Sequence, residues 1–307
     1  MSVTIHAQDV SRWFGEVVAL NKFSAQIGPG VTGVLGPNGA GKSTFFKLCT
    51  SQLRPSQGDL RMFGEPVWAN YEILRRIGFC PDGENYYEEM TGYEFVVALA
   101  RCTGMASADA IRSSLRAIER AGMTDRMHDR IGSYSKGMRQ RVKLAQSMAH
   151  DPEILFLDEP MTGLDPIARH DTFQLIRELG EEGKTVVVSS HILYEIENVT
   201  SKVILLNNGC VLAEGDIRQI RDLIDQHPHS VSIECDRPRE LANRLINHSH
   251  IVSMEFDENG DGLKIFTRDP NAFYDRLPDL VLEDEFQIGR IASPDDNLQA
   301  VFEYLVK

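Results

Sequence analysis

The chain has 307 residues, of which 42% are hydrophobic and 25% are charged, an ordinary composition for a globular protein with a sizeable core. Its 32 basic and 45 acidic residues give a formal net charge of −13. Residues 228–307 hold 8 basic and 16 acidic residues, a net of −8, which leaves −5 for residues 1–227. An acidic chain is a poor non-specific binder of nucleic acid or anionic lipid, so we expect no nucleic-acid partner.

The spacing of the cysteines and the lack of long apolar stretches indicate the cell compartment in which the chain functions. The five cysteines show no Cys-x-x-Cys spacing, which favours reduced cytosolic thiols over a disulfide framework or a zinc site. The N-terminus has no basic-then-apolar signal pattern, and no apolar stretch approaches the roughly 18 residues of a membrane span. We expect a cytoplasmic chain without direct membrane insertion.

Short apolar runs alternate with helical patterns through residues 31–206. Val31–Leu35 ends in Gly-Pro and indicates a buried strand that enters a loop, with helix-compatible sequence from Lys42. Further runs at Ile154–Leu157, Thr185–Val188 and Val203–Leu206 also indicate buried strands. The alternation predicts an α/β fold whose mainly parallel sheet is flanked by helices.

Residues 82–150 interrupt this alternation. They contain no convincing strand, and the helix-like stretches are Tyr93–Ala100, Ser107–Ala121 and Lys136–His150. Ser107 is the expected N-cap of the second stretch. The pattern predicts an α-helical insertion over about residues 82–150.

From about His229 the pattern indicates a small α+β domain, and we predict domains 1–225 and 226–307. The strand-like runs are Val231–Glu234, Ile251–Phe256, Leu263–Thr267 and Phe286–Ile291, and the helix-like runs are Arg239–Asn247 and Asn297–Val306. Asp257–Gly262 matches the start of a calcium loop, but Arg268 stands where that loop needs a glutamate. The flanking strands favour a hairpin turn there.

A glycine-rich loop follows the first predicted strand and matches the pattern G-x-x-x-x-G-K-[ST]. Its residues are Gly36, Pro37, Asn38, Gly39, Ala40, Gly41, Lys42, Ser43 and Thr44. Glycines let backbone N–H groups curl around phosphate oxygens, and the following helix adds its positive dipole end. We expect Lys42 to reach the β- and γ-phosphates of a nucleotide and the Ser43 hydroxyl to bind Mg²⁺.

Two acidic residues follow the second predicted strand. Asp158 and Glu159 stand at its carboxyl end, where open α/β sheets bind ligands. Asp158 is suited to holding Mg²⁺, and Glu159 to polarising the attacking water as a general base.

A second anion site is indicated at Ser133–Arg141. Ser135 and Gly137 open a predicted helix, and Ser135 lies 23 residues before Asp158. A hydroxyl, free N–H groups and a helix dipole suit a phosphate. One nucleotide needs two such cradles only if each chain covers the nucleotide of a neighbour.

Together these motifs resemble the ABC ATPase family over roughly Val3–Gly215. Tyr134–Met138, YSKGM, resembles the family's signature loop, which is commonly LSGGQ, and Thr162–Pro166 resembles its D-loop. His191 looks like the switch histidine, and Phe14, with Trp13 beside it, looks like the aromatic residue that stacks on adenine.

The resemblance implies a P-loop NTPase core with antiparallel strands near the N-terminus and ATP and Mg²⁺ as cofactors. It further implies head-to-tail dimers, made with a second copy or a homologous ATPase subunit. Ser135 and Gly137 of one subunit would contact the γ-phosphate held by Lys42 of the other, and His191 would contact that phosphate in cis. A separate transmembrane permease subunit would dock near Glu84–Glu94, placing the chain on the cytoplasmic face of the membrane.

One position departs from the family pattern. Asp82 stands where the family usually has a glutamine, and a carboxylate can coordinate Mg²⁺ or accept hydrogen bonds from its water shell but cannot donate a hydrogen bond. Its effect on hydrolysis leaves two interpretations open: an ATP-hydrolysing transporter subunit of exporter type, or an ATP-binding regulatory or non-transport ABC protein with weak hydrolysis. The C-terminal domain resembles that of some bacterial drug- and lipid-exporter ATPases.

Overall fold

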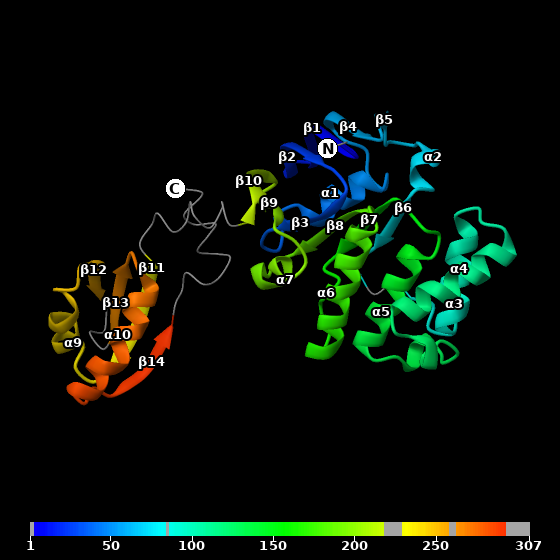
Figure 1. Ribbon diagram of the computed structural model, residues 1–307. Coiled ribbons are helices and arrows are strands. Elements are labelled where there is room, and N and C mark those ends of the chain that lie inside the picture. Colours follow the sequence, from blue (N-terminus) through cyan, green and yellow to red (C-terminus); the bar gives the residue numbers. More distant parts are fainter. Residues whose placement is uncertain (1–2, 84–85, 218–228, 258–261, 293–307) are drawn as a thin grey trace. The chain divides into compact units, whose positions relative to one another are not determined.

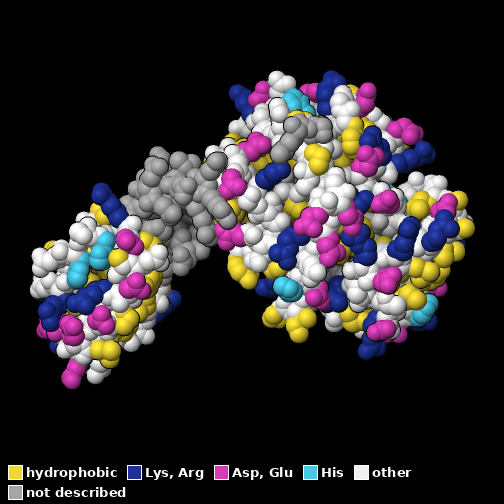
Figure 2. Space-filling model, viewed as in Figure 1, with side chains coloured by type: hydrophobic (Ala, Val, Ile, Leu, Met, Phe, Trp, Pro, Cys, Tyr) yellow, Lys and Arg dark blue, Asp and Glu magenta, His cyan; other side chains and the backbone are white. Residues whose placement is uncertain are grey.

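The computed structural model describes residues 3–83, 86–217, 229–257 and 262–292. The chain forms two compact units, Met1–Ile217 and Arg218–Lys307. The boundary predicted between residues 225 and 226 falls in the stretch 218–228, outside the described residues. No helix of the described part is long and apolar enough to cross a membrane. Figure 2 shows acidic and basic side chains interspersed on the visible face of each unit.

A six-stranded sheet with the order β10-β9-β3-β8-β7-β6 forms the centre of the first unit (Figure 1). Its strands are β3 (Gly30–Leu35), β6 (Ile77–Cys80), β7 (Ile154–Asp158), β8 (Thr185–Ser190), β9 (Lys202–Asn207) and β10 (Cys210–Asp216). Every neighbouring pair is parallel except β9 and β10. All residues of β7 and β8 are buried, as expected for parallel strands covered on both faces. The residues after β3, β6, β7 and β8 therefore meet at one edge.

A second, antiparallel sheet packs beside it with the order β2-β1-β4-β5. Its strands are β1 (Ile5–Phe14), β2 (Val17–Ile27), β4 (Gln57–Met62) and β5 (Glu65–Pro66), and the short helix α2 (Tyr71–Leu74) follows. Helix α1 (Lys42–Cys49) lies between the two sheets: the ring centroid of Phe45 is 4.3 Å from that of Phe23 on β2, and the centroid of Phe46 is 5.3 Å from that of Phe156 on β7. These buried contacts fix the helix that begins at the glycine-rich loop.

Three helices cover the other face of the main sheet. They are α5 (Lys136–Met148), α6 (Pro166–Glu181) and α7 (Leu193–Glu197). Val34 belongs to the apolar cluster around α1, and its neighbour Gly33 points to the opposite face because side chains alternate along a strand. A Cβ on Gly33 would lie 2.3 Å from a side-chain carbon of Ile196 on α7, so only glycine lets the helix pack this closely.

The predicted helical insertion is confirmed between β6 and β7. Its elements are α3 (Gly92–Cys102), α4 (Ser107–Arg120), η1 (Thr124–Arg126), η2 (Ile131–Ser133) and α5. A capping box starts α3, in which Thr91 accepts from the Glu94 N–H and Glu94 accepts from the Thr91 N–H. The prediction of Ser107 as an N-cap is wrong. Ser107 is already helical, and the extended residue before it, Ala106, has no side chain that could cap.

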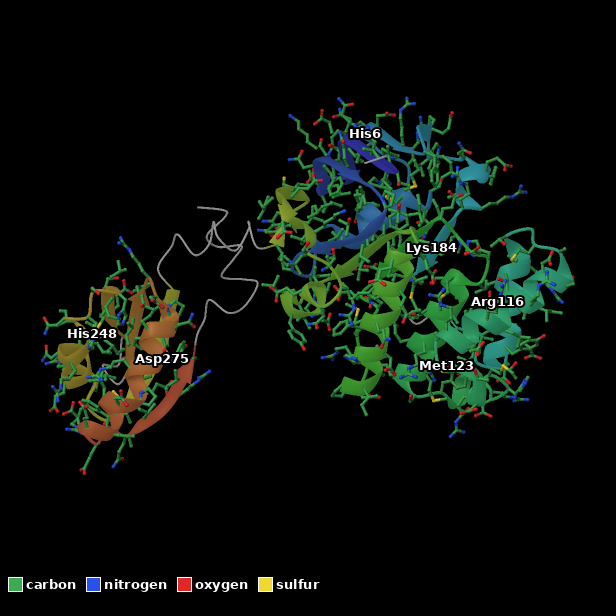
Figure 3. The ribbon with its side chains drawn as sticks, in the orientation of Figure 1. His6, Arg116, Met123, Lys184, His248 and Asp275 are labelled. Atoms are coloured by element: carbon green, nitrogen blue, oxygen red, sulfur yellow. The ribbon has the colours of Figure 1, made fainter. Side chains whose placement is uncertain are left out.

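Ion pairs join the insertion, and the residues just after it, to the turn between α6 and β8. Arg120 on α4 lies 2.8 Å from Glu182 beyond the end of α6, and Lys184 donates to Asp151 at 2.5 Å and to the Pro152 carbonyl at 2.9 Å. The Lys184 hydrogen bond is the main cause of a lowered pKa at Asp151, to which the nearby charge of Arg116 on α4 contributes. Lys184 and Arg116 are labelled in Figure 3.

The second unit, as far as it is described, runs β-α-β-β-α-β. Its elements are β11 (His229–Cys235), α9 (Pro238–Leu245), β12 (Ile251–Phe256), β13 (Gly262–Thr267), α10 (Pro270–Glu283) and β14 (Ile288–Ala292). The strand order β12-β13-β11-β14, with all pairs antiparallel, is that of the ferredoxin-like split β-α-β fold. β12 and β13 pair in antiparallel fashion, whereas residues 258–261 of the turn predicted at 257–262 lie outside the described residues. The helix predicted at 297–306 lies outside the described residues.

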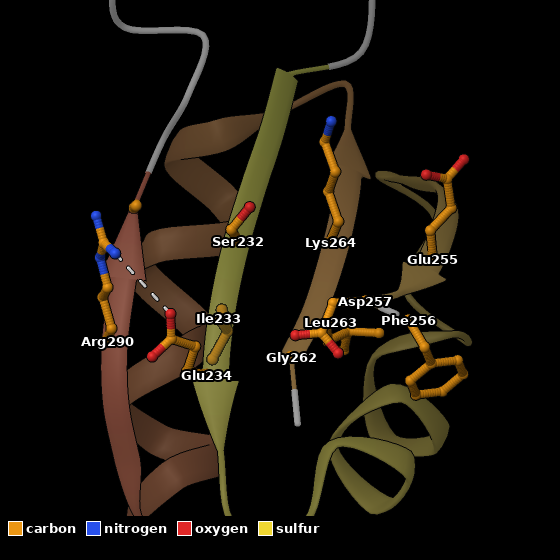
Figure 4. Close-up of a pocket in the computed structure, with 11 residues that line it drawn as sticks. Ser232, Ile233, Glu234, Glu255, Phe256, Asp257, Gly262, Leu263, Lys264 and Arg290 are labelled. Carbon is orange, nitrogen blue, oxygen red and sulfur yellow. Dashed lines mark ion pairs between the residues drawn. The ribbon is translucent and has the colours of Figure 1, made fainter. Parts of the chain in front are cut away.

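The two faces of this sheet differ in character. Apolar residues of β11 and β13 pack with α9 and α10 around Phe273. On the other face, Ser232 and Glu234 of β11, Lys264 of β13 and Arg290 of β14 border a cavity of about 570 Å³ (Figure 4). Arg290 lies 4.0 Å from Glu234, so this face carries an ion pair between neighbouring strands.

The aromatic contacts of α1 predict a large cost for truncating Phe23. We expect Phe23→Ala to lower the free energy of unfolding by about 3–5 kcal/mol, because the ring is fully buried against Phe45. Urea unfolding followed by tryptophan fluorescence measures this change in the first unit alone, since both tryptophans, Trp13 and Trp68, lie there. Tyr71→Ala, at a 75% exposed side chain, is the control; a similar loss there would contradict the packing argument.

Candidate active site

The glycine-rich loop folds around the ammonium of Lys42. Lys42 Nζ donates to the carbonyl oxygens of Gly36 at 2.7 Å and Pro37 at 3.3 Å. Gly41 precedes the helix with a φ of +108°, and a Cβ there would lie 2.6 Å from the Ala19 carbonyl oxygen. That position therefore requires glycine. The loop encloses a cavity of about 170 Å³, lined by residues 37–44 with Ala19, Asp82 and Glu159.

The two acidic residues at the end of β7 are buried and share one serine partner on β8. Ser189 Oγ donates to Asp158 Oδ1 at 2.6 Å and accepts from the Glu159 N–H at 2.9 Å. Glu159 has a φ of +49°, a left-handed conformation that is strained for a residue with a Cβ and needs support from its surroundings. The Ser189 hydroxyl provides that support and turns Glu159 out of the strand.

Both carboxylate oxygens of Glu159 lie beside cationic or ionisable groups. Oε1 is 3.2 Å from Lys42 Nζ, and Oε2 is 2.9 Å from His191 Nδ1. Oε1 is buried and accepts no hydrogen bond from the described residues, so the Lys42 ion pair is its contact there. The structure thus brings together the three residues that the sequence nominated for catalysis.

The oxygen atoms of Asp158, Ser43 and Asp82 belong to the same site. Burial raises the pKa of Asp158, hydrogen bonds from Ser189 and Ser43 oppose the shift, and the charges of Asp82 and Glu159 add to it. Repulsion between carboxylates at a buried position is relieved by a cation, and such oxygen donors suit Mg²⁺. Within the described residues no three His, Cys, Asp or Glu side chains form a metal-binding group.

The other predicted residues lie outside the phosphate cavity. Ser135 is exposed at the N-cap of α5, where its hydroxyl accepts from the Met138 N–H at 3.2 Å. A Cβ on Gly137 would meet Leu164 of the predicted D-loop at 3.6 Å. Phe14 is 46% exposed at the end of β1, and the Arg12 guanidinium lies 4.7 Å from its ring centroid. None of the three lines the cavity that contains Lys42.

Sequence reasoning missed two residues of this region. Ser189 lies in the stretch that contains His191, and its place two residues before the histidine, at a strand end, was a usable signal. Lys143 on α5 is only 3% exposed and donates to the Pro81, Asp82 and Gly83 carbonyl oxygens. Nothing in its helical surroundings in the sequence distinguishes it from a solvated lysine.

A glycine loop at a helix N-terminus after the parallel strand β3, with a buried carboxylate pair after the parallel strand β7 of the same sheet, defines a nucleoside-triphosphate site of the P-loop class. The comparisons with known proteins narrow this class. A family described as ABC transporter matches residues 20–162. A Nod factor export ATP-binding protein I from Rhizobium sp. (strain N33) is 33% identical over 272 residues, which cover 87% of each chain.

By their names, another relative is an ATP-binding resistance protein and a solved structure is an ABC transporter cassette. The daunorubicin/doxorubicin resistance ATP-binding protein DrrA of Streptomyces peucetius is 32% identical and aligns over 78% of this chain and 73% of its own. A solved dimeric bacterial ABC transporter cassette is 26% identical with a TM-score of 0.64, covering 70% of this chain and 99% of that one.

The chain belongs to the family of ABC transporter ATP-binding proteins. The fold class and the assignment as an ATP-binding, ATP-hydrolysing transporter subunit are thereby confirmed.

The double role of Ser189 predicts a defect in both stability and turnover. We expect Ser189→Ala to lower the free energy of unfolding by about 1–3 kcal/mol, because the buried Glu159 N–H and Asp158 lose their partner. ATP turnover should fall roughly 10-fold, equivalent to about 1.4 kcal/mol of barrier, as measured by phosphate release. Ser190→Ala is the matched control, since Ser190 is equally buried but hydrogen-bonds Glu195 and the Ile192 N–H. An equal loss of turnover in both variants would contradict this role of Ser189.

Proposed function

We propose that this chain hydrolyses Mg·ATP with Glu159 as the general base and powers export through a separate membrane subunit. The observation that carries the proposal is the fixed position of the Glu159 carboxylate, between Lys42 and His191 beside the phosphate cavity. A general base needs a defined place next to the phosphoryl group more than an unusual reactivity.

Each residue of the site has a separate task in this proposal. Lys42 exchanges its loop carbonyl and Glu159 partners for oxygens of the β- and γ-phosphates. Glu159 then accepts a proton from the attacking water as the oxygen of that water bonds to the γ-phosphorus and the bond to the β–γ bridging oxygen breaks. His191 contacts the γ-phosphate and keeps Glu159 oriented through the Nδ1 contact.

Ser43, Asp158 and Asp82 are the residues that we propose to hold Mg²⁺, directly or through water. The ion would neutralise charge that develops on the phosphate oxygens. The buried position of Asp158 and the repulsion that it receives from Asp82 and Glu159 support this assignment.

We further propose that two copies form a head-to-tail dimer around two ATP molecules. Ser135 and Gly137 lie outside the phosphate cavity of their own chain. Ser135 nevertheless presents an exposed hydroxyl at a helix N-terminus, which suits an anion brought by another molecule. A relative of known structure is a dimeric cassette. Phe14 would stack on adenine once the Arg12 guanidinium moves aside or packs over the base.

The names of the relatives support the proposal of export through a membrane partner. The names of two of them denote Nod factor export and daunorubicin/doxorubicin resistance. We place the contact with the transmembrane subunit near Glu84–Glu94, of which residues 84 and 85 are not described. Tyr86 packs within the insertion, 5.7 Å below the Arg139 guanidinium, whereas Tyr87 is 66% exposed. Tyr87 is thus the aromatic residue that we expect to meet the partner.

The assignment of Glu159 predicts a variant that binds ATP but hydrolyses it poorly. We expect Glu159→Gln to lower turnover by about 100-fold or more and to form a dimer with Mg·ATP. Phosphate release and light scattering after size exclusion measure the two effects. Glu72→Gln, at an 82% exposed glutamate, is the control. Turnover of Glu159→Gln within about twofold of wild type would remove Glu159 from this role.

The proposed dimer predicts that two inactive variants restore activity when mixed. In a mixed dimer of Lys42→Ala and Ser135→Arg, both defects fall on one site and the other site is intact. Random pairing should then recover about a quarter of wild-type turnover, because half the dimers are mixed and each has one working site. A mixture of Lys42→Ala with the Lys42→Ala/Ser135→Arg double variant is the inactive control. No recovery in the first mixture would mean that Ser135 acts on the nucleotide of its own chain or on none.

A further inference from the structure

Lys143 is a buried cation in a place that hydrophobic packing alone does not explain. It lies on α5 and is 3% exposed, and burying an ammonium is costly unless its donors are satisfied. Lys143 Nζ donates to the carbonyl oxygens of Pro81 at 2.7 Å, Asp82 at 3.3 Å and Gly83 at 3.4 Å. An ammonium has three N–H donors, so three consecutive carbonyls use its full capacity.

These bonds fix the backbone of the loop that follows β6. Three successive carbonyl groups directed to one ammonium make residues 81–83 wrap around it. The Asp82 residue then borders the cavity that contains Lys42 and Glu159. Among the described residues Lys143 has no ion-pair partner, so its charge is directed to this loop rather than to one carboxylate.

Lys143 also brings a positive charge to this loop. Its Nζ lies 3.3 Å from the carbonyl oxygen of Asp82, the residue that we propose as a metal ligand.

We propose that Lys143 is a positioning residue for ATP hydrolysis, which holds the loop 81–83 so that Asp82 faces the magnesium site and which offsets the charge of Asp82. This inference rests on the metal-binding role proposed for Asp82. Ser135 caps the helix that carries Lys143, and Lys143 is hydrogen-bonded to the loop that carries Asp82. Helix α5 therefore connects the hydroxyl that we assign to the partner's ATP with the Asp82 loop. Engagement of Ser135 by the partner's nucleotide would therefore move Asp82 as well.

The test replaces Lys143 with methionine, which keeps the length of the side chain and removes its charge and donors. Gln146→Met is the matched control, because Gln146 joins the same helix to β6 by one hydrogen bond, to the Phe79 carbonyl oxygen at 2.7 Å, without touching the loop. We expect Lys143→Met to raise the Mg²⁺ concentration for half-maximal binding of a fluorescent ATP analogue roughly 10-fold. Gln146→Met should leave it within about twofold.

A second readout needs no nucleotide and separates this inference from the proposed function. Hydrogen exchange of the peptide containing residues 81–83 should be about 10-fold faster in Lys143→Met than in wild type or Gln146→Met, since local opening of the loop becomes easier. Lys143→Gln, which keeps two N–H donors but no charge, should restore slow exchange and leave the raised Mg²⁺ requirement. Lys143→Gln also carries the test if Lys143→Met does not fold, as judged by tryptophan fluorescence.

The double variant Lys143→Met/Asp82→Asn decides whether Lys143 acts through Asp82. If it does, the Mg²⁺ requirement of the double variant equals that of Asp82→Asn alone, because the carboxylate to be placed and compensated is gone. Additive effects of the two substitutions, or a Lys143→Met variant with the Mg²⁺ requirement and exchange rate of Gln146→Met, would overturn the inference. A failure of Glu159→Gln to slow turnover would instead refute the proposed function and leave the exchange result intact.

Discussion

Burial of charge at one edge of the parallel sheet is the constraint on which the rest of the first unit depends. In the described part of the chain, the buried lysine, aspartate and glutamate side chains are Lys42, Lys143, Asp158, Glu159 and Glu195. Each contacts, or lies beside, the loops that follow β3, β6, β7 and β8. Charges withdrawn from water must be paired or hydrogen-bonded, so this edge forms only when loop carbonyls, serine hydroxyls and opposite charges lie within reach of one another.

The surrounding fold brings these groups within hydrogen-bonding distance of one another. Aromatic packing on both sides of α1 fixes the start of the helix at Lys42, and the parallel pairing of β7 with β8 places Ser189 opposite Asp158. The same pairing gives Glu159 a partner for its N–H in a left-handed conformation. Helix α5 places Lys143 within hydrogen-bonding distance of the loop that follows β6. Hydrogen bonds therefore join the scaffold to the site: Ser189 and Lys143 hold the residues that we propose for catalysis and metal binding.

Sequence reasoning located β3, β7, β8 and β9 of the main sheet and the helical insertion, because continuous apolar runs and regular helical spacing are local signals. The short strand β6, Ile77–Cys80, was not predicted. It missed α10, in which Pro278 looks like a helix breaker although Asp269 caps the helix and Phe273 and Leu277 pack on the sheet. Tertiary packing outweighed the local preference there. The same limit applies to Ser107, which is compatible with a cap but became the first helical residue.

The sequence by itself determined the nucleotide chemistry of this protein: the glycine loop at 36–44 and the carboxylates Asp158 and Glu159 are contiguous motifs, whose meaning depends on nearby residues alone. Only the tertiary structure decided which side chains support them. Ser189 and Lys143 come from elements distant in the chain from Glu159 and Asp82, and an ordinary serine and an ordinary lysine acquire their roles through burial beside those groups. Such roles arise from the dielectric surroundings and from the hydrogen-bond partners that folding assembles, which no local pattern records.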